Sequence, residues 1–415
     1  MPRLSILLAQ IVVILVLARL VGWIFSRIRQ PKVVGEMAAG LLLGPSCLGW
    51  MAPGLSASLF PAESLGLLEL LSQIGLVLFM FLIGLELNTG ELRRQGRMAI
   101  AASGSSIALP FALGVALAFH LPHGPARDGA DFAAFALFLG TAMSVTAFPV
   151  LARILAEKRL LGSRVGAVAI ACAAVDDVVA WCLLAAVLLL VRAPGHAATP
   201  WLIPVGLAAY VLLMFFGARP ALRTLERIHC RRGRLTPDLL ALVLVLVAGA
   251  AWLTDRLGIH ALFGAFLLGA VMPRDARFQR ALEERFEGTI VLLLPLFFSL
   301  TGLKTSVRLL SGAGGWLDCL LIVTAAVAGK FGGAAFSARL MGMPWREALA
   351  LGGLLNTRGL MELVILGIGL DAGVISPALF SMMVIMAFAT TFMTTPLLEW
   401  LGPERLRRPA ASLGG

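Results

Sequence analysis

The residues best suited to chemistry are two adjacent aspartates, Asp176 and Asp177, in the apolar run AIACAAVDDVVAWCLLA. A charge in the middle of a membrane is costly, so an ionisable residue there is expected to be functional. Neighbouring carboxylates suppress each other's ionisation, and burial adds to this effect. Such a pair can hold a proton near neutral pH and exchange it for a hard cation that prefers oxygen ligands. The alternative is one aspartate salt-bridged for folding and the other facing a cavity.

Three further charges lie within apolar segments. Lys330, in AAVAGKFGGAAF, requires a carboxylate partner, and the aspartate pair is the obvious candidate. Whether Lys330 is a structural counter-charge or also exchanges its proton stays open. Arg358 and Glu362 are four residues apart in LLNTRGLMELVI, one helical turn if the segment is helical. They could form a self-satisfied ion pair that stabilises the core.

Two apolar segments are interrupted by residues that break helices. One carries Thr141, Ser144, Thr146 and Pro149, and the other carries Asn356, Thr357, Arg358 and Gly359. Proline, glycine and hydroxyl side chains occur where a membrane helix breaks and offers carbonyls and helix ends to an ion. A Ser/Thr-rich helix could instead form a tight packing interface.

The elements that position these residues must be membrane helices. Of the 415 residues, 59% are hydrophobic and 14% are charged, and the mean hydropathy is +0.93. Soluble domains carry about a quarter charged residues, so this composition excludes an ordinary soluble enzyme and a disordered chain. The net charge of +11 would suggest nucleic acid in a soluble protein. In a membrane protein the same excess belongs to cytoplasmic loops, and we expect no nucleic-acid partner.

The composition offers no sign of a resident cofactor. The five cysteines are scattered, without a C-x-x-C pair or a histidine cluster at ligand spacing. The glycine-rich phosphate loops of nucleotide-binding proteins are absent from the sequence. We therefore expect a single membrane domain over residues 1–415 without a cofactor, a resident metal or a soluble regulatory domain.

Spans of about 20 apolar residues predict an all-α polytopic membrane protein with about thirteen transmembrane helices. The predicted spans are 4–26, 33–50, 66–86, 98–119, 132–152, 165–191, 200–217, 237–254, 259–273, 286–303, 319–339, 347–370 and 377–400. The loops between them are alternately rich and poor in Lys and Arg, with 25 of the 34 basic residues on one side and 6 on the other. The positive-inside rule then predicts an outside N-terminus and a cytoplasmic C-terminus.

The two interrupted spans, the fifth and the twelfth, are seven apart. Because seven is odd, equivalent helices would point in opposite directions across the membrane. This spacing predicts an inverted repeat, in which spans four to six match spans eleven to thirteen.

Several segments, in order along the chain, resemble the monovalent cation:proton antiporter-2 family. The matching segments are QPKVVGEMAAGLLLGPS, GLVLFMFLIGLEL, TAMSVTAFPVLARIL, the Asp176-Asp177 pair, GIHALFGAFLLGAVMP, LPLFFSLTGLKT and LLNTRGLMELVILGIG. The resemblance implies a thirteen-helix fold in which two discontinuous helices cross beside the aspartates. It implies a core domain (about 98–191 and 319–400), a dimerisation domain (about 4–86 and 237–303) and a linker span (about 200–217).

The resemblance also implies roles for single residues. Asp177 would be the principal carrier of the cation and the proton, and Asp176 would pair with Lys330. The family moves its core against the dimerisation domain, as in an elevator, usually as a homodimer in the lipid bilayer. Many relatives carry a cytoplasmic nucleotide-binding domain, which we do not expect in this chain.

We therefore expect a secondary antiporter, not an enzyme, that exchanges H⁺ for Na⁺ or K⁺ in the cell (inner) membrane. Asp177 would bind the proton or the cation in turn, and Thr141, Ser144 and Thr146 would complete the cation shell. A cation channel is the first alternative, and a structural membrane scaffold is another. An intramembrane aspartyl protease needs two facing aspartates, whereas adjacent helical residues diverge by about 100°. The choice between Na⁺ and K⁺ and the stoichiometry stay open.

Overall fold

The computed structural model describes residues 4–86, 96–121, 132–161, 163–192, 206, 209–257, 261–310 and 313–406. Within these ranges every regular element is a helix. Eight stretches are long and apolar enough to cross a membrane, which confirms the all-α membrane class. They are α1 (Leu4–Arg27), α5 (Ala62–Glu86), α7 (Gly96–His120), α10 (Arg164–Arg192), α13 (Pro237–Arg256), α15 (Ala276–Lys304), α20 (Pro377–Leu401), and α16 (Ala313–Val327) continued by η3 (Ala328–Gly332) and α17 (Gly333–Leu340). The total of thirteen spans and the orientation of the termini stay predictions.

Both interruptions expected from the sequence are present. The first separates α8 (Phe132–Ser144) from α9 (Phe148–Glu157), and the second separates α18 (Trp345–Leu355) from α19 (Leu360–Asp371). Pro149 falls in the first turn of α9, where its missing N–H costs no helical hydrogen bond. The fifth and twelfth spans are therefore each built from two shorter helices.

Some predicted boundaries differ from the observed helices. The span predicted at 33–50 is too long, because α2 (Lys32–Leu43) ends at the C-cap residue Gly44. Pro45 follows, and its ring and missing N–H disfavour a further helical turn. The short helices α3 (Leu48–Met51) and α4 (Pro53–Leu59) follow. In contrast, α15 begins ten residues earlier than the predicted 286, because Asp275 Oδ1 accepts the N–H groups of Arg277 and Phe278 at 3.0 and 2.8 Å and caps a polar first turn.

Of the span predicted at 200–217, the structure describes residues 206 and 209–217. Its described end forms a π-helical turn, η1 (Leu213–Ala218), which continues into α12 (Arg219–Arg232). The other described helices are α14 (Ala261–Val271), η2 (Val307–Leu310) and η4 (Pro403–Leu406).

The chain forms two compact units. Unit 1 comprises Met1–Ile11, Pro61–Leu87 and Arg192–Phe297, and unit 2 comprises Val12–Phe60, Asn88–Val191 and Phe298–Gly415. In unit 1, α5 packs closely on α14, which also contacts α13. A Cβ atom added to Gly84 would lie 2.0 Å from the carbonyl oxygen of Phe266, so glycine permits this close packing of α5 and α14.

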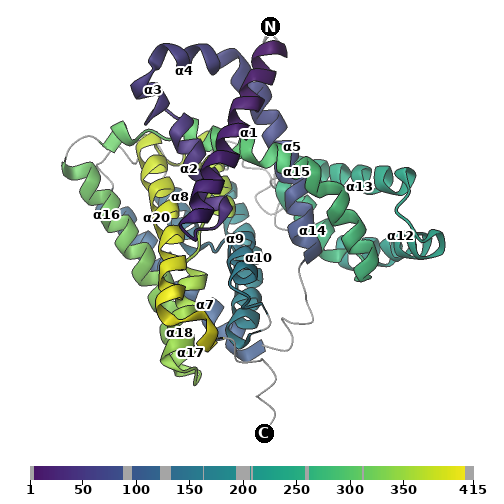
Figure 1. The fold of residues 1–415 in the computed structure, drawn as a ribbon. Helices are drawn as coiled ribbons and strands as arrows, with labels where there is room; N and C mark the ends of the chain where they lie inside the picture. The colour runs from purple at the N-terminus through teal and green to yellow at the C-terminus, as the bar shows by residue number, and fades with distance from the viewer. Residues whose placement is uncertain are drawn as a thin grey trace. The chain divides into compact units, whose positions relative to one another are not determined.

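Unit 2 contains every candidate site residue named from the sequence. Helix α7 packs along α8 and α17, and α20 also contacts α19. Figure 1 shows α20 beside α16 and α18. The α7–α8 contact also depends on glycine, because a Cβ on Gly114 would lie 2.7 Å from the Cα of Gly140. Glycines thus allow α7 to pack closely on α8, the helix that ends at the first break.

Candidate functional site

The two aspartates lie in the middle of α10, and each is only 1% exposed. Consecutive residues of a helix point about 100° apart. Asp176 and Asp177 therefore face different neighbours although they are adjacent in sequence, and the two carboxylates differ in their hydrogen bonding.

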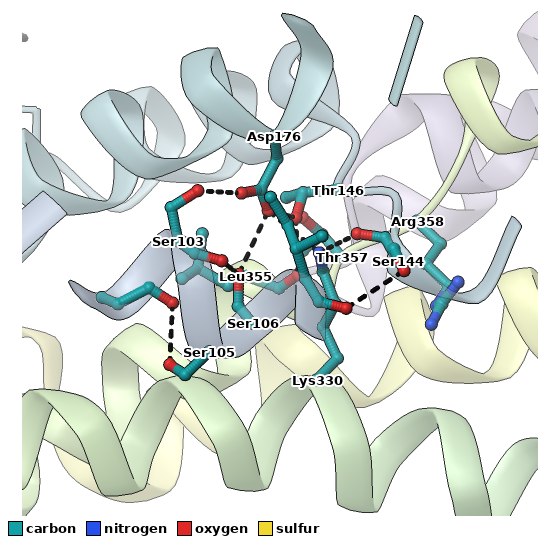
Figure 2. A network of polar contacts seen from close by, with 12 residues as sticks. Ser103, Ser105, Ser106, Ser144, Thr146, Asp176, Lys330, Leu355, Thr357 and Arg358 are labelled. Carbon is teal, nitrogen blue, oxygen red and sulfur yellow. Dashed lines mark hydrogen bonds and ion pairs between the residues drawn. The ribbon is translucent and has the colours of Figure 1, made fainter. Parts of the chain in front are cut away.

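Asp176 accepts hydrogen bonds from four side chains on three different segments (Figure 2). Ser103 Oγ donates to Oδ1 at 2.5 Å, whereas Thr146 Oγ1 and Lys330 Nζ donate to Oδ2 at 2.5 and 2.9 Å. Ser106 Oγ lies 3.3 Å from Oδ2. A buried carboxylate requires such partners, and this one has them on both oxygens.

Asp177 has a different environment. Its Oδ1 atom is buried and has no hydrogen-bond partner among the described residues. A buried polar atom without a partner carries a substantial free-energy cost and calls for an explanation. Binding a proton or a cation at this carboxylate would supply the missing interaction.

Lys330 connects Asp176 to the end of the first half-helix. The residue lies in the π-helical turn η3, and its side chain is fully buried. Besides its ion pair with Asp176, its ammonium donates a hydrogen bond to the backbone carbonyl of Ser144, the last residue of α8. The apolar run around Lys330 does not predict this π-helical turn, a feature that is frequent at functional sites.

Arg358 holds the same helix end from the second break. Its Nη1 and Nη2 atoms donate to the carbonyl oxygens of Ala142 and Met143 at 3.1 and 2.6 Å. Nη1 also pairs with Glu362 Oε1 at 3.1 Å, and both side chains are fully buried. Three consecutive carbonyls at the C-terminus of α8 thus accept hydrogen bonds from two cations, which offsets the negative end of the helix dipole.

The two breaks contact each other directly. The N–H of Ala147 donates to the carbonyl oxygen of Thr357 at 2.9 Å, and Thr146 Oγ1 lies 3.2 Å from the carbonyl oxygen of Leu355. The non-helical residues of each break therefore satisfy backbone groups of the other, which is how irregular backbone is tolerated within a membrane protein.

The three hydroxyls expected around the cation have different contacts. Thr146 contacts Asp176, whereas Thr141 donates to the carbonyl of Leu137 at 2.7 Å within its own helix. Ser144 donates to the carbonyl of Gly140 at 2.7 Å and lies 3.2 Å from that of Ile107. The structure therefore brings one of the three against the aspartates, and the ligand roles of all three stay predictions.

Sequence reasoning missed Ser103 and Ser106. Their spacing of three residues places both on one face of α7, but the sequence alone does not show which face turns toward α10. Within the described residues, His, Cys, Asp and Glu side chains form no group of three or more that could hold a resident metal.

Comparison with known proteins gives the family. The model of the sodium/hydrogen exchanger transmembrane family matches residues 12–400. The chain belongs to this family. It is 43% identical over 403 residues to the Na⁺/H⁺ antiporter NhaS4 of Synechocystis, covering 96% of this chain and 98% of that protein.

Longer members of the exchanger family are also similar. The chain is 42% identical to cation/H⁺ antiporter 17 of Arabidopsis thaliana and 35% identical to K⁺/H⁺ antiporter 1 of Saccharomyces cerevisiae. These alignments cover 95% and 97% of this chain but 48% and 47% of the relatives, so the chain spans about half of their length. The fold matches that of the sodium proton antiporter MjNhaP1 from Methanocaldococcus jannaschii, with a TM-score of 0.65 at 15% identity over 97% of this chain and 98% of that one.

Membership of the exchanger family confirms the resemblance inferred from the sequence segments. It also confirms that the chain is an integral membrane ion transporter of the cation/proton antiporter class and not an enzyme. The protease alternative is therefore wrong.

Proposed function

We propose that the chain is a secondary antiporter that exchanges H⁺ for Na⁺ or K⁺, with Asp177 as the carrier of both. The observation that carries this proposal is the contrast between the adjacent carboxylates. Asp176 has donors on both oxygens, whereas Asp177 Oδ1 is buried and has no hydrogen-bond partner in the part of the chain that the structure describes. The names of the relatives support both cations, since one is a Na⁺/H⁺ antiporter and another a K⁺/H⁺ antiporter.

Exchange follows from competition for one carboxylate. Asp177 binds either a proton or the cation, so loading one requires release of the other. Oxygen ligands around residues 141–146 complete the cation shell, and of the three hydroxyls named there Thr146 is the one that contacts Asp176. The ion pair between Asp176 and Lys330 balances the neighbouring charge, and the pair between Arg358 and Glu362 stabilises the crossed breaks.

Transport requires the site to open to one side of the membrane and then to the other. We propose the family's elevator-type movement, in which a core domain containing the two broken helices slides against a dimerisation domain. The working form is a homodimer in the cell (inner) membrane.

Substitution of the carrier tests the proposal. Asp177→Asn retains the size of the side chain but cannot ionise, and should abolish cation-driven proton movement in proteoliposomes. Undiminished exchange by this variant would exclude Asp177 as the carrier. Parallel pH-jump assays with Na⁺, K⁺ and Li⁺, with and without an ionophore that clamps the voltage, measure selectivity and electrogenicity. A channel would instead conduct the cation without an obligatory counter-proton.

A further inference from the structure

Two buried serines reach Asp176 from a helix that contributed no candidate residue to the sequence analysis. Ser103 Oγ lies 2.5 Å from Oδ1 of Asp176, and Ser106 Oγ lies 3.3 Å from Oδ2 (Figure 2). The two serines are 1% and 0% exposed. Helix α7 therefore presents a pair of hydroxyls to this carboxylate within the interior of unit 2.

Ser103 bonds to a different oxygen of the Asp176 carboxylate than the other donors do. Lys330 and Thr146 both bond to Oδ2, whereas Ser103 bonds to Oδ1. A carboxylate held at both oxygens has a fixed orientation, while one held at a single oxygen can rotate about its last side-chain bond. Ser103 thus fixes the direction in which Asp176 presents Oδ2 to the Lys330 ammonium.

Helix α7 can orient Asp176 toward Lys330 because it packs closely on the segment that carries the lysine. A Cβ added to Gly329 would lie 2.8 Å from the Cα of Pro110, and one added to Gly333 would lie 2.8 Å from the carbonyl oxygen of Ser105. These close contacts place the serines and the lysine in one tightly packed group of helices.

We propose that Ser103 and Ser106 are positioning residues of the exchange site, which hold Asp176 toward Lys330 and thereby keep the lysine ammonium away from Asp177. The proposal rests on the proposed function of Asp177 as the carrier. Without the hydroxyls, Asp176 would lose its fixed orientation, and the Lys330 ammonium would be able to pair with the neighbouring carboxylate. A Lys330 ammonium paired with Asp177 would compete with the transported cation for this carboxylate.

Competition of this kind has a distinct kinetic signature. A competitor at the carrier raises the apparent KM for the cation and leaves the maximal rate at saturating cation nearly unchanged. Loss of folded protein has the opposite effect, because it lowers the maximal rate and leaves KM unchanged. The two parameters therefore separate a positioning role from a merely structural one.

The experiment measures Na⁺- and K⁺-driven proton movement in proteoliposomes containing the full chain. Ser103→Ala should raise the apparent KM about tenfold, the scale expected for loss of a hydrogen bond to a charged group. Ser106→Ala should raise it less, because the Ser106 hydroxyl lies 3.3 Å from Asp176 Oδ2 and shares its one proton with the carbonyl oxygen of Ser103 at 3.1 Å. Ser103→Thr retains the hydroxyl and should restore a KM near that of the unmodified protein.

Ser105→Ala is the matched control. Ser105 lies on the same helix between the two serines, but its hydroxyl contacts the carbonyl oxygens of Ala101, Ala102 and Gly333. Its KM should be unchanged. The proposal is overturned by an unchanged KM in Ser103→Ala, by an equal rise in Ser105→Ala, or by a Ser103→Thr protein that behaves like Ser103→Ala.

A second comparison of variants and a measurement on Asp177→Asn complete the test of the positioning role. Should Ser103→Ala fail to fold, the comparison of KM between Ser106→Ala and Ser105→Ala replaces it. Asp177→Asn, measured in the same vesicles, separates the two proposals. Exchange that survives in Asp177→Asn contradicts the carrier itself, whereas an inactive Asp177→Asn beside an unchanged KM in Ser103→Ala contradicts only the positioning role.

Discussion

The backbone N–H of Ala147 donates a 2.9 Å hydrogen bond to the carbonyl oxygen of Thr357, joining the breaks of two discontinuous helices that are about two hundred residues apart in sequence. The bond satisfies a donor that the first break would otherwise leave buried without a partner. Close to this bond, Arg358 and Lys330 donate hydrogen bonds to the last three carbonyl oxygens of α8. The crossing is thus a continuous hydrogen-bonded unit built from backbone groups and buried cations.

Arg358 should be irreplaceable by lysine. Its planar guanidinium reaches two carbonyls of α8 and the Glu362 carboxylate together, whereas a lysine ammonium is a single point charge on a flexible chain. We expect Arg358→Lys to lower the midpoint of thermal unfolding in detergent and to impair exchange, although the charge is retained. Glu362→Gln leaves the carbonyl contacts in place but removes the carboxylate partner of the buried Arg358 charge, so it too should lower the unfolding midpoint. Wild-type stability in Arg358→Lys would contradict the clamping role.

The buried ion pair of Lys330 and Asp176 should matter far more to stability than an exposed one. Lys330→Met leaves the Asp176 carboxylate buried beside no cation, a change that costs about 3–5 kcal/mol in comparable pairs. We expect a large loss of thermal stability, recovered in part by the double variant Lys330→Met/Asp176→Asn.

Lys304→Met supplies the comparison for this measurement. Lys304 pairs with Asp371 at 3.1 Å, but the two side chains are 33% and 59% exposed. Exposed pairs contribute about 0–1 kcal/mol, so this variant should unfold within a few degrees of the parent. Similar losses in Lys330→Met and Lys304→Met would show that burial does not strengthen the dependence on the lysine.

The features that sequence reasoning found are local in the chain. Each break is marked by hydroxyl residues, proline or glycine within an apolar run, and a charge such as Lys330 in such a run signals that a partner is required. No tertiary information is needed to read these patterns, which is why the two pairs of half-helices could be predicted.

The contacts of the hydroxyl side chains could not be predicted from the sequence, because they depend on the direction in which each side chain points. Thr141 and Ser144 bond to carbonyls four residues earlier, as hydroxyls inside a helix commonly do. Thr146 lies in the break, where it can reach Asp176. Ser103 and Ser106 are indistinguishable in sequence from packing serines, because only the rotation of α7 directs them toward α10.

Competition at Asp177 predicts a specific dependence on pH. Protons occupy the carboxylate more as pH falls, so the apparent KM for Na⁺ or K⁺ should rise at lower pH while the maximal rate at saturating cation stays constant. In the range where the proton dominates, KM should rise about tenfold per pH unit, as for one proton displaced by one cation. Initial rates at several fixed pH values in proteoliposomes measure this slope. A KM independent of pH would show that the two ions do not share a site.

Two glycines on α7 should respond in opposite ways to the same substitution. Alanine is the better helix former by about 1 kcal/mol, so it should be tolerated or stabilising wherever space allows. A Cβ at Gly104 has no atom within 4 Å, whereas a Cβ at Gly114 would lie 2.7 Å from the Cα of Gly140. Because backbone cannot move aside as a flexible side chain can, Gly114→Ala must push α7 away from α8.

Gly114→Ala is therefore expected to lower the unfolding midpoint and the exchange rate, and Gly104→Ala to preserve both. Thermal unfolding in detergent and transport in proteoliposomes, measured on the two variants in parallel, test the difference. The displacement of α7 would also move Ser103 relative to Asp176, since Gly114 and Ser103 belong to the same helix. Gly114→Ala should consequently show the raised KM expected of Ser103→Ala. A Gly114→Ala protein that loses stability but keeps an unchanged KM would show that the packing of α7 on α8 does not control the orientation of Asp176.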